Sequence, residues 1–257
     1  LNLDTEDEYE LCVGCAGGGD LVASFAYTPE AVEGGQVARE IALTGLKGGH
    51  SGIDIILGLG NANKLMARFL RTAIRDLGAR IVTINAGTAR NAIPRESFAT
   101  VVLPSDKVSA FDGALSAFAA EVKDEIGAIE PNFAIAAKDV ALPAKAMSVA
   151  DSKRFNNAVV GAPNGVHAMS TSVEGVVETS INLAIIKLAD GKADVTLSAR
   201  SSINSARDAL REVATSVFEN IGATVKWGDA YPGWKPNADS EVVNMMKAVH
   251  RDMFGKD

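Results

Sequence analysis

The spacing of apolar residues switches repeatedly along this chain between the two-residue alternation of a strand and the 3.6-residue repeat of a helix. This switching constrains the fold more than any other feature. The segment 61–77 has the helical pattern, with Asn61 or Asn63 as the expected N-cap and Gly78 as the expected C-terminal glycine. The first half predicts the order β-α-β-β-α-β over 36–46, 61–77, 79–85, 97–103, 105–126 and 132–140. That order is typical of a ferredoxin-like unit.

The second half of the chain repeats most of this order. It predicts α-β-β-α-β over 148–160, 176–188, 193–200, 205–221 and 224–227. Its two central strands flank Asp190-Gly191, a dipeptide that favours a hairpin turn. The sequence therefore predicts an α+β fold with two related lobes, each based on a ferredoxin-like unit. Helices are expected to cover one face of a mostly antiparallel sheet.

Breaks rich in glycine or proline bracket this central region. Three consecutive glycines at 17–19 precede it, and the segment 231–236, which reads YPGWKP, follows it. A further helix is expected over 240–254. We therefore expect three parts, which are 1–17, 18–230 and 231–257.

The composition limits the partners of the chain. Its 257 residues carry a net charge of −7, and a pI near 5.1 argues against a basic nucleic-acid-binding surface. No apolar run reaches the ~20 residues that span a bilayer, and no basic leader followed by an apolar segment opens the chain. Cys12 and Cys15 form a CxxC without a second pair that would complete a zinc site, so we expect free thiols. These observations predict a cytoplasmic protein with no nucleic-acid or membrane partner.

Only three histidines occur, and they limit the metal chemistry of this chain. With His50, His167 and His250 alone, it cannot assemble a histidine-rich metal centre. His50 lies in a glycine-flanked loop between a strand and a helix, where it is placed to reach beyond its own domain or to stand as a solvated surface residue. The surrounding GHSGI resembles the G-x-S-x-G elbow of serine hydrolases, but its fifth residue is Ile53 rather than glycine.

Three more polar residues are candidates for binding. Asn91 precedes an Ile-Pro turn and could direct its amide outward, the alternative being a bond to its own turn. Arg200 ends a strand pattern, where its guanidinium could clamp a carboxylate or form an ordinary surface charge. Asp4 opens an acidic run and could bind a metal, although a solvated charge run is the alternative.

Five segments taken together resemble one protein family: LTGLKGGHSGIDIILGLGNANKLMARFL, NAGTARNAIPRESFAT, PNGV, EGVVETSINLAI and AYPGWKPNADSEV. The family is that of the bacterial cytosolic non-specific dipeptidases, also called aminoacylhistidine or Xaa-His dipeptidases. It belongs to the zinc metallopeptidases that include carnosinases. The resemblance runs over the whole chain.

The resemblance implies that 18–230 form a lid and dimerisation domain, flanked on both sides by remnants of an α/β zinc-peptidase catalytic domain. It implies two Zn²⁺ ions per full-length subunit, of which only one ligand, Asp4, matches a residue of this sequence. It also implies metal-assisted hydrolysis of a dipeptide substrate and a homodimer formed through the lid.

The resemblance also assigns roles to the lid residues. It implies that His50 donates to the substrate carbonyl and oxyanion in a partner subunit's active site. Asn91 would hold the backbone of the substrate, and Arg200 its C-terminal carboxylate. The chain alone is expected to be inactive. The alternative is a non-enzymatic homodimerisation module.

Overall fold

The computed structural model describes residues 14–235, 237 and 240–255. Its long strands are β1 (Gly17–Ala26), β3 (Gln36–Thr44), β5 (Arg80–Ala86), β7 (Ser97–Pro104), β8 (Ala134–Val140), β10 (Gly165–Met169), β11 (Val177–Ala189), β12 (Lys192–Ser201) and β13 (Thr224–Tyr231). Two-residue strands are β2 (Glu30–Ala31), β4 (Gly49–His50), β6 (Ala92–Ile93) and β9 (Lys145–Ala146). The helices are α1 (Ala62–Leu77), α2 (Val108–Ile126), α3 (Val149–Gly161), α4 (Asn204–Glu219) and α5 (Glu241–Phe254), with short 3₁₀ turns η1 (Asp54–Leu57) and η2 (Ser105–Lys107).

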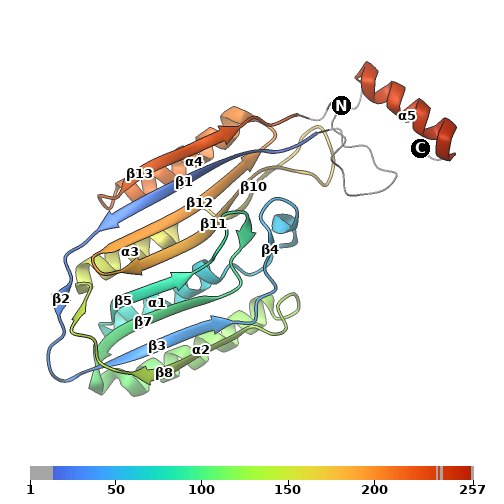
Figure 1. The fold of residues 1–257 in the computed structure, drawn as a ribbon. Coiled ribbons are helices and arrows are strands. Elements are labelled where there is room, and N and C mark those ends of the chain that lie inside the picture. Colours follow the sequence, from blue (N-terminus) through green and yellow to red (C-terminus); the bar gives the residue numbers. More distant parts are fainter. Residues whose placement is uncertain (1–13, 236, 238–239, 256–257) are drawn as a thin grey trace.

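One antiparallel sheet organises the molecule. Its strand order is β13-β1-β12-β11-β5-β7-β3-β8, and β10 pairs with β11 beside this path. Helices α1 to α4 lie on one face of the sheet, and the opposite face carries no helix (Figure 1). Helix α5 lies beyond the end of β13 (Figure 1). The predicted antiparallel sheet with helices on one face is confirmed.

The sheet consists of two ferredoxin-like units side by side. The first unit runs β3-α1-β5-β7-α2-β8, and its strands lie in the sheet as β8-β3-β7-β5. The second runs β1-α3-β11-β12-α4-β13, and its strands lie as β13-β1-β12-β11. The two spatial orders are the same. Because β1 precedes β3 in the sequence, the whole first unit is inserted between the first strand and the first helix of the second unit.

The glycine run at 17–19 corrects one expectation. We expected it to end an opening segment, whereas Gly17, Gly18 and Gly19 begin β1 and pair with β12 in regular register. A Cβ on Gly17 would lie 2.4 Å from the backbone nitrogen of Gly233, and one on Gly18 would lie 2.6 Å from the ring of Tyr231. Glycine is required here because the segment after β13 crosses the strand closely. The run therefore completes the second unit.

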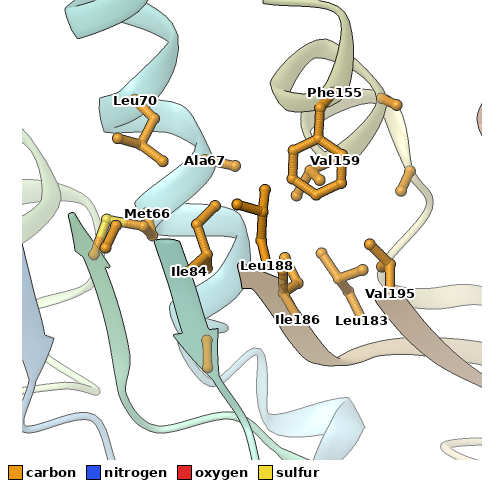
Figure 2. Close-up of a cluster of buried hydrophobic side chains, with 14 of the residues drawn as sticks. Met66, Ala67, Leu70, Ile84, Phe155, Val159, Leu183, Ile186, Leu188 and Val195 are labelled. Carbon is orange, nitrogen blue, oxygen red and sulfur yellow. The ribbon is translucent and has the colours of Figure 1, made fainter. Parts of the chain in front are cut away.

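The two units share one core. They meet where β11 pairs with β5, and α1 packs against α3 over this junction. Figure 2 shows α1 and α3 side chains meeting side chains from the strands. The labelled members, all at most 5% exposed, are Met66, Ala67, Leu70, Ile84, Phe155, Val159, Leu183, Ile186, Leu188 and Val195. The units are therefore parts of one packed body.

Several local signals act as the sequence predicts. Asn61 caps α1 by accepting from the backbone N–H groups of Asn63 and Lys64, and Gly78 ends the helix in the left-handed region at φ 69°. Asp190 and Gly191 adopt φ of 50° and 87° in the β11–β12 hairpin, as its turn requires. Among the described helices, none combines the length and the apolar character needed to cross a membrane.

Candidate functional site

A cavity of about 510 Å³ lies where β1 begins and where β12 and β13 end. Both predicted substrate-binding residues line it: Asn91 from a loop, and Arg200 from the end of a strand far away in the sequence. Its lining residues are Gly18, Gly19, Asp20, Arg90, Asn91, Ser198, Arg200, Asp229 and Tyr231. The two distant segments thus meet at one hollow.

Arg200 carries a cationic group that is held in place without being neutralised. Its Nη1 donates to the hydroxyl of Tyr231 at 3.1 Å, and its Nε donates to Oγ of Ser51 at 3.4 Å. No carboxylate pairs with it among the described residues, whereas nearby Arg90 pairs with Asp20 at 2.6 Å. A half-buried guanidinium held by two hydroxyls retains N–H donors for an anionic group.

His50 lies in β4, which pairs with β6 so that His50 faces Ala92. The backbone N–H of Ile53 donates to Nδ1 of His50 at 3.2 Å. A nitrogen that accepts this bond carries no proton, so the hydrogen-bond pattern assigns the proton of the neutral ring to Nε2. The loop geometry thus makes Nε2 a hydrogen-bond donor.

Gly52 brings His50 and Arg200 together. A Cβ on Gly52 would lie 3.2 Å from Cε1 of His50 and 3.3 Å from Nε of Arg200, so both side chains pass close to this backbone. The N–H of Ser51 donates to the carbonyl of Asn91 at 2.8 Å. The three predicted lid residues therefore lie in one neighbourhood. Asp4 lies outside the described residues.

A buried carboxylate closes the loop that carries His50. Glu130 is 1% exposed and accepts from the backbone N–H of Lys47 at 2.8 Å and from that of Gly60 at 2.9 Å. The two donors lie at the two ends of the loop. No role was predicted for Glu130, because a single glutamate so far from His50 in the sequence carries no local signal.

A network of asparagines fixes the other side of the site. Asn182 donates to the carbonyl of Ala92 at 2.7 Å, and Asn61 donates to Oδ1 of Asn182 and of Asn164. The amide of Asn63 donates to the carbonyl of Leu183. These asparagines occur in three of the segments that carry the family resemblance, but apart from the helix cap at Asn61 or Asn63 no role was predicted for them. The available signal was Asn182, a polar residue within the apolar run 181–186.

The described residues do not form a metal centre. Among them, no group of three or more histidine, cysteine, aspartate or glutamate side chains is arranged to hold an ion. His167 lies on β10 and His250 on α5. Cys15 is exposed, and Cys12 lies outside the described range. The donor set present thus does not fit a two-zinc site.

Comparison with known proteins bears on these observations. Residues 41–130 match the peptidase dimerisation domain family. The chain is 37% identical over 256 residues to cytosol non-specific dipeptidase of Escherichia coli (strain K12), covering 53% of that protein. It also superposes on the crystal structure of aminoacylhistidine dipeptidase from Vibrio alginolyticus with a TM-score of 0.94 and 42% identity, over 98% of this chain and 52% of that one.

The resemblance to the dipeptidases is confirmed. The chain spans about half the length of both dipeptidases and aligns over essentially its entire own length. The fold of two ferredoxin-like units is that of the matching part of the Vibrio dipeptidase. The region matched by the dimerisation domain begins in β3 and ends at Glu130, so it falls within the first unit.

Proposed function

We propose that this chain is the lid-centred part of a zinc-dependent dipeptidase that hydrolyses Xaa-His and other dipeptides in the cytoplasm. Residues 18–230 would form the lid, and residues 1–17 and 231–257 would belong to the catalytic domain. The similarity to two dipeptidases over nearly the whole chain supports this proposal, as does the match to a peptidase dimerisation domain.

The convergence of His50, Asn91 and Arg200 is the observation that carries the proposal. Arg200 would bind the C-terminal carboxylate of the dipeptide, because its guanidinium lacks a carboxylate partner among the described residues. Asn91 would hold the peptide backbone, since an amide side chain both donates and accepts. His50 would donate from Nε2 to the scissile carbonyl and stabilise the developing oxyanion in a partner subunit's site.

The metal-dependent part of the reaction would depend on residues beyond those described. We propose two Zn²⁺ ions per full-length subunit, with Asp4 as one ligand. Since the described residues form no metal centre, the 257-residue chain alone is proposed to hydrolyse no dipeptide. Turnover of a Xaa-His dipeptide by the purified chain with added zinc would contradict this.

The role of His50 can be tested in a chimera in which this chain replaces the aligned segment of the Escherichia coli dipeptidase. The chimera is expected to hydrolyse dipeptides. His50→Ala should then lower kcat by about 10²–10³-fold, the loss typical of one oxyanion donor. His167→Ala is the matched control, because His167 is an exposed histidine on β10 to which the proposal gives no role. Equal kcat in the two variants would count against the assignment.

We also propose that the chain forms a homodimer through the lid. If the chain has no part in catalysis, homodimerisation is its alternative function. The match of 41–130 to a dimerisation domain supports this, and a two-fold axis is the commonest arrangement. The facing edges of the two units, β5 and β11, pair with each other within the chain. The contact would therefore use another edge strand or a helix face. Sedimentation should show a dimer, and a strict monomer at high concentration would contradict it.

A further inference from the structure

A second cavity, of about 460 Å³, lies beside the β4–β6 strand pair and is separate from the one lined by Arg200. Residues of β4, β5, β6, β7 and β11 and of the adjoining loops form its walls. They are Lys47, Gly48, Gly49, Asn85, Ala86, Gly87, Thr88, Ala89, Ala92, Ile93, Pro94, Arg95, Glu96, Phe98 and Lys187. The proposed dipeptidase function uses none of its polar side chains.

One wall of this cavity is a row of side chains across three strands. Lys187 in β11 is in register with Asn85 in β5, which is in register with Phe98 in β7. Their sequence neighbours Ile84, Ala86 and Ala99 are buried in the core, so the row projects from the face of the sheet without helices. Lys187 donates to Oδ1 of Asn85, and the Phe98 ring is 38% exposed. The row thus presents a cation beside an aromatic surface.

The charges around the cavity are unbalanced. Lys47, Arg95 and Lys187 line it, and none of them forms an ion pair with a carboxylate in the described part of the chain. Glu96 is the one carboxylate in the lining, so three positive charges face one negative charge. This excess is unexpected in a chain of net charge −7, because like charges gathered at one hollow repel one another unless an anion is bound.

Two glycines shape the walls around these charges. Gly87 has φ 70°, and a Cβ there would lie 1.9 Å from the carbonyl oxygen of Ala184. Gly48 has φ 65°, and a Cβ there would lie 3.2 Å from Cβ of Arg95. Another residue would be strained at either position because of the positive φ, and at Gly87 it would also force the backbone to shift. The hollow is therefore preformed, which lowers the entropy cost of binding a ligand.

We propose that this cavity binds a small molecule with at least two negative charges, carried on phosphate or carboxylate groups. Arg95, Lys187 and Lys47 would contact the charged groups, because a guanidinium and two ammonium groups match either oxyanion. Phe98 would contact an apolar part of the ligand. The site shares no lining residue with the cavity of Arg200.

Calorimetric titration of the full chain with pyrophosphate and with citrate tests the proposal, and the two probes distinguish the phosphate from the carboxylate source. At least one probe should bind saturably at one site per chain. The double variant Arg95→Gln/Lys187→Gln should weaken that binding by about tenfold or more, as expected for the loss of charge-assisted hydrogen bonds. Added salt should weaken it as well.

The matched control is Arg71→Gln/Lys153→Gln, which removes the same charge at two exposed residues that line a different small cavity. It should leave the affinity within about twofold of the wild-type value. Thermal melts of both double variants show that each is folded. The proposal is overturned if neither probe binds saturably, or if the two double variants lose the same affinity.

Discussion

The buried carboxylate of Glu130 holds both ends of the loop that carries His50. It accepts from the N–H groups of Lys47 and Gly60, and it is 1% exposed. The position of His50 therefore depends in part on a residue in the turn that precedes β8.

Replacing Glu130 with glutamine tests this closure. Each carboxylate oxygen of Glu130 accepts from one backbone N–H group. In the glutamine variant, the side-chain NH₂ group would replace one of these oxygens and face a donor, so one buried hydrogen bond would be lost. We expect Glu130→Gln to lower the free energy of unfolding by about 1–3 kcal/mol, measured by urea denaturation. Glu121→Gln is the control, because the Glu121 side chain is 62% exposed in a surface ion pair. Similar losses in both variants would argue against the closure.

At the scale of elements, Lys64 links α1 to the end of α3. Its Nζ donates to the carbonyl oxygens of Val159, Val160 and Ala162, which lie at the C-terminal end of α3. These carbonyls would otherwise lack a partner within the helix. Burial lowers the pKa of Lys64 from 10.5 to about 8. The lysine therefore couples the packing of two helices to pH.

This coupling predicts a pH dependence of stability with a definite sign. Between about pH 8 and pH 10.5 the unfolded chain binds more protons at Lys64 than the folded chain does. The free energy of unfolding contributed by this group must then rise as the pH rises through that window. Urea denaturation at several pH values gives the free energy of unfolding of the wild type and of Lys64→Met. The difference between the two curves isolates the contribution of Lys64. Parallel curves for the two proteins would contradict the prediction.

The close approach of β1 to the segment after β13 gives a prediction for glycine replacement. A Cβ at Gly17 would lie 2.4 Å from the backbone nitrogen of Gly233, and backbone cannot move aside cheaply. We expect Gly17→Ala to lower the free energy of unfolding by about 1–3 kcal/mol. Gly34→Ala is the control, because a Cβ on Gly34 meets nothing within 4 Å. A loss that is no larger at Gly17 than at Gly34 would refute the steric explanation.

Most elements could be predicted from the sequence because their signals are local. Asn61 and Gly78 mark the ends of α1, and Asp190-Gly191 marks the β11–β12 turn. The start of strand β1 was not predicted, because the three glycines that begin it have low strand propensity, and their place in the sheet depends on distant pairing with β12 and close contact with residues 231–233. Likewise, His50, Asn91 and Arg200 could be selected as candidates, but their convergence depends on pairing across the sheet. The boundaries at 17 and 231 remain a prediction.

At the scale of the whole molecule, the insertion of one unit into the other joins distant segments at the site. Strand β1 and strands β12 and β13 meet at the cavity of Arg200, while the inserted first unit supplies Asn91 and His50. The shared core at the β11–β5 junction fixes the two units relative to each other. The proposed substrate site thus forms only when both units are folded.

The central claim is that this site holds a dipeptide with its C-terminal carboxylate on Arg200. The most direct measurement is KM in the chimera with the Escherichia coli dipeptidase, for a dipeptide and for the same dipeptide amidated at its C-terminus. The native-sequence chimera should prefer the free carboxylate by about tenfold or more. Arg200→Ala should raise KM for the free dipeptide and leave the amide nearly unchanged, so that the preference disappears. If Arg200→Ala raises both KM values equally, Arg200 does not bind the carboxylate and the account of the site is wrong.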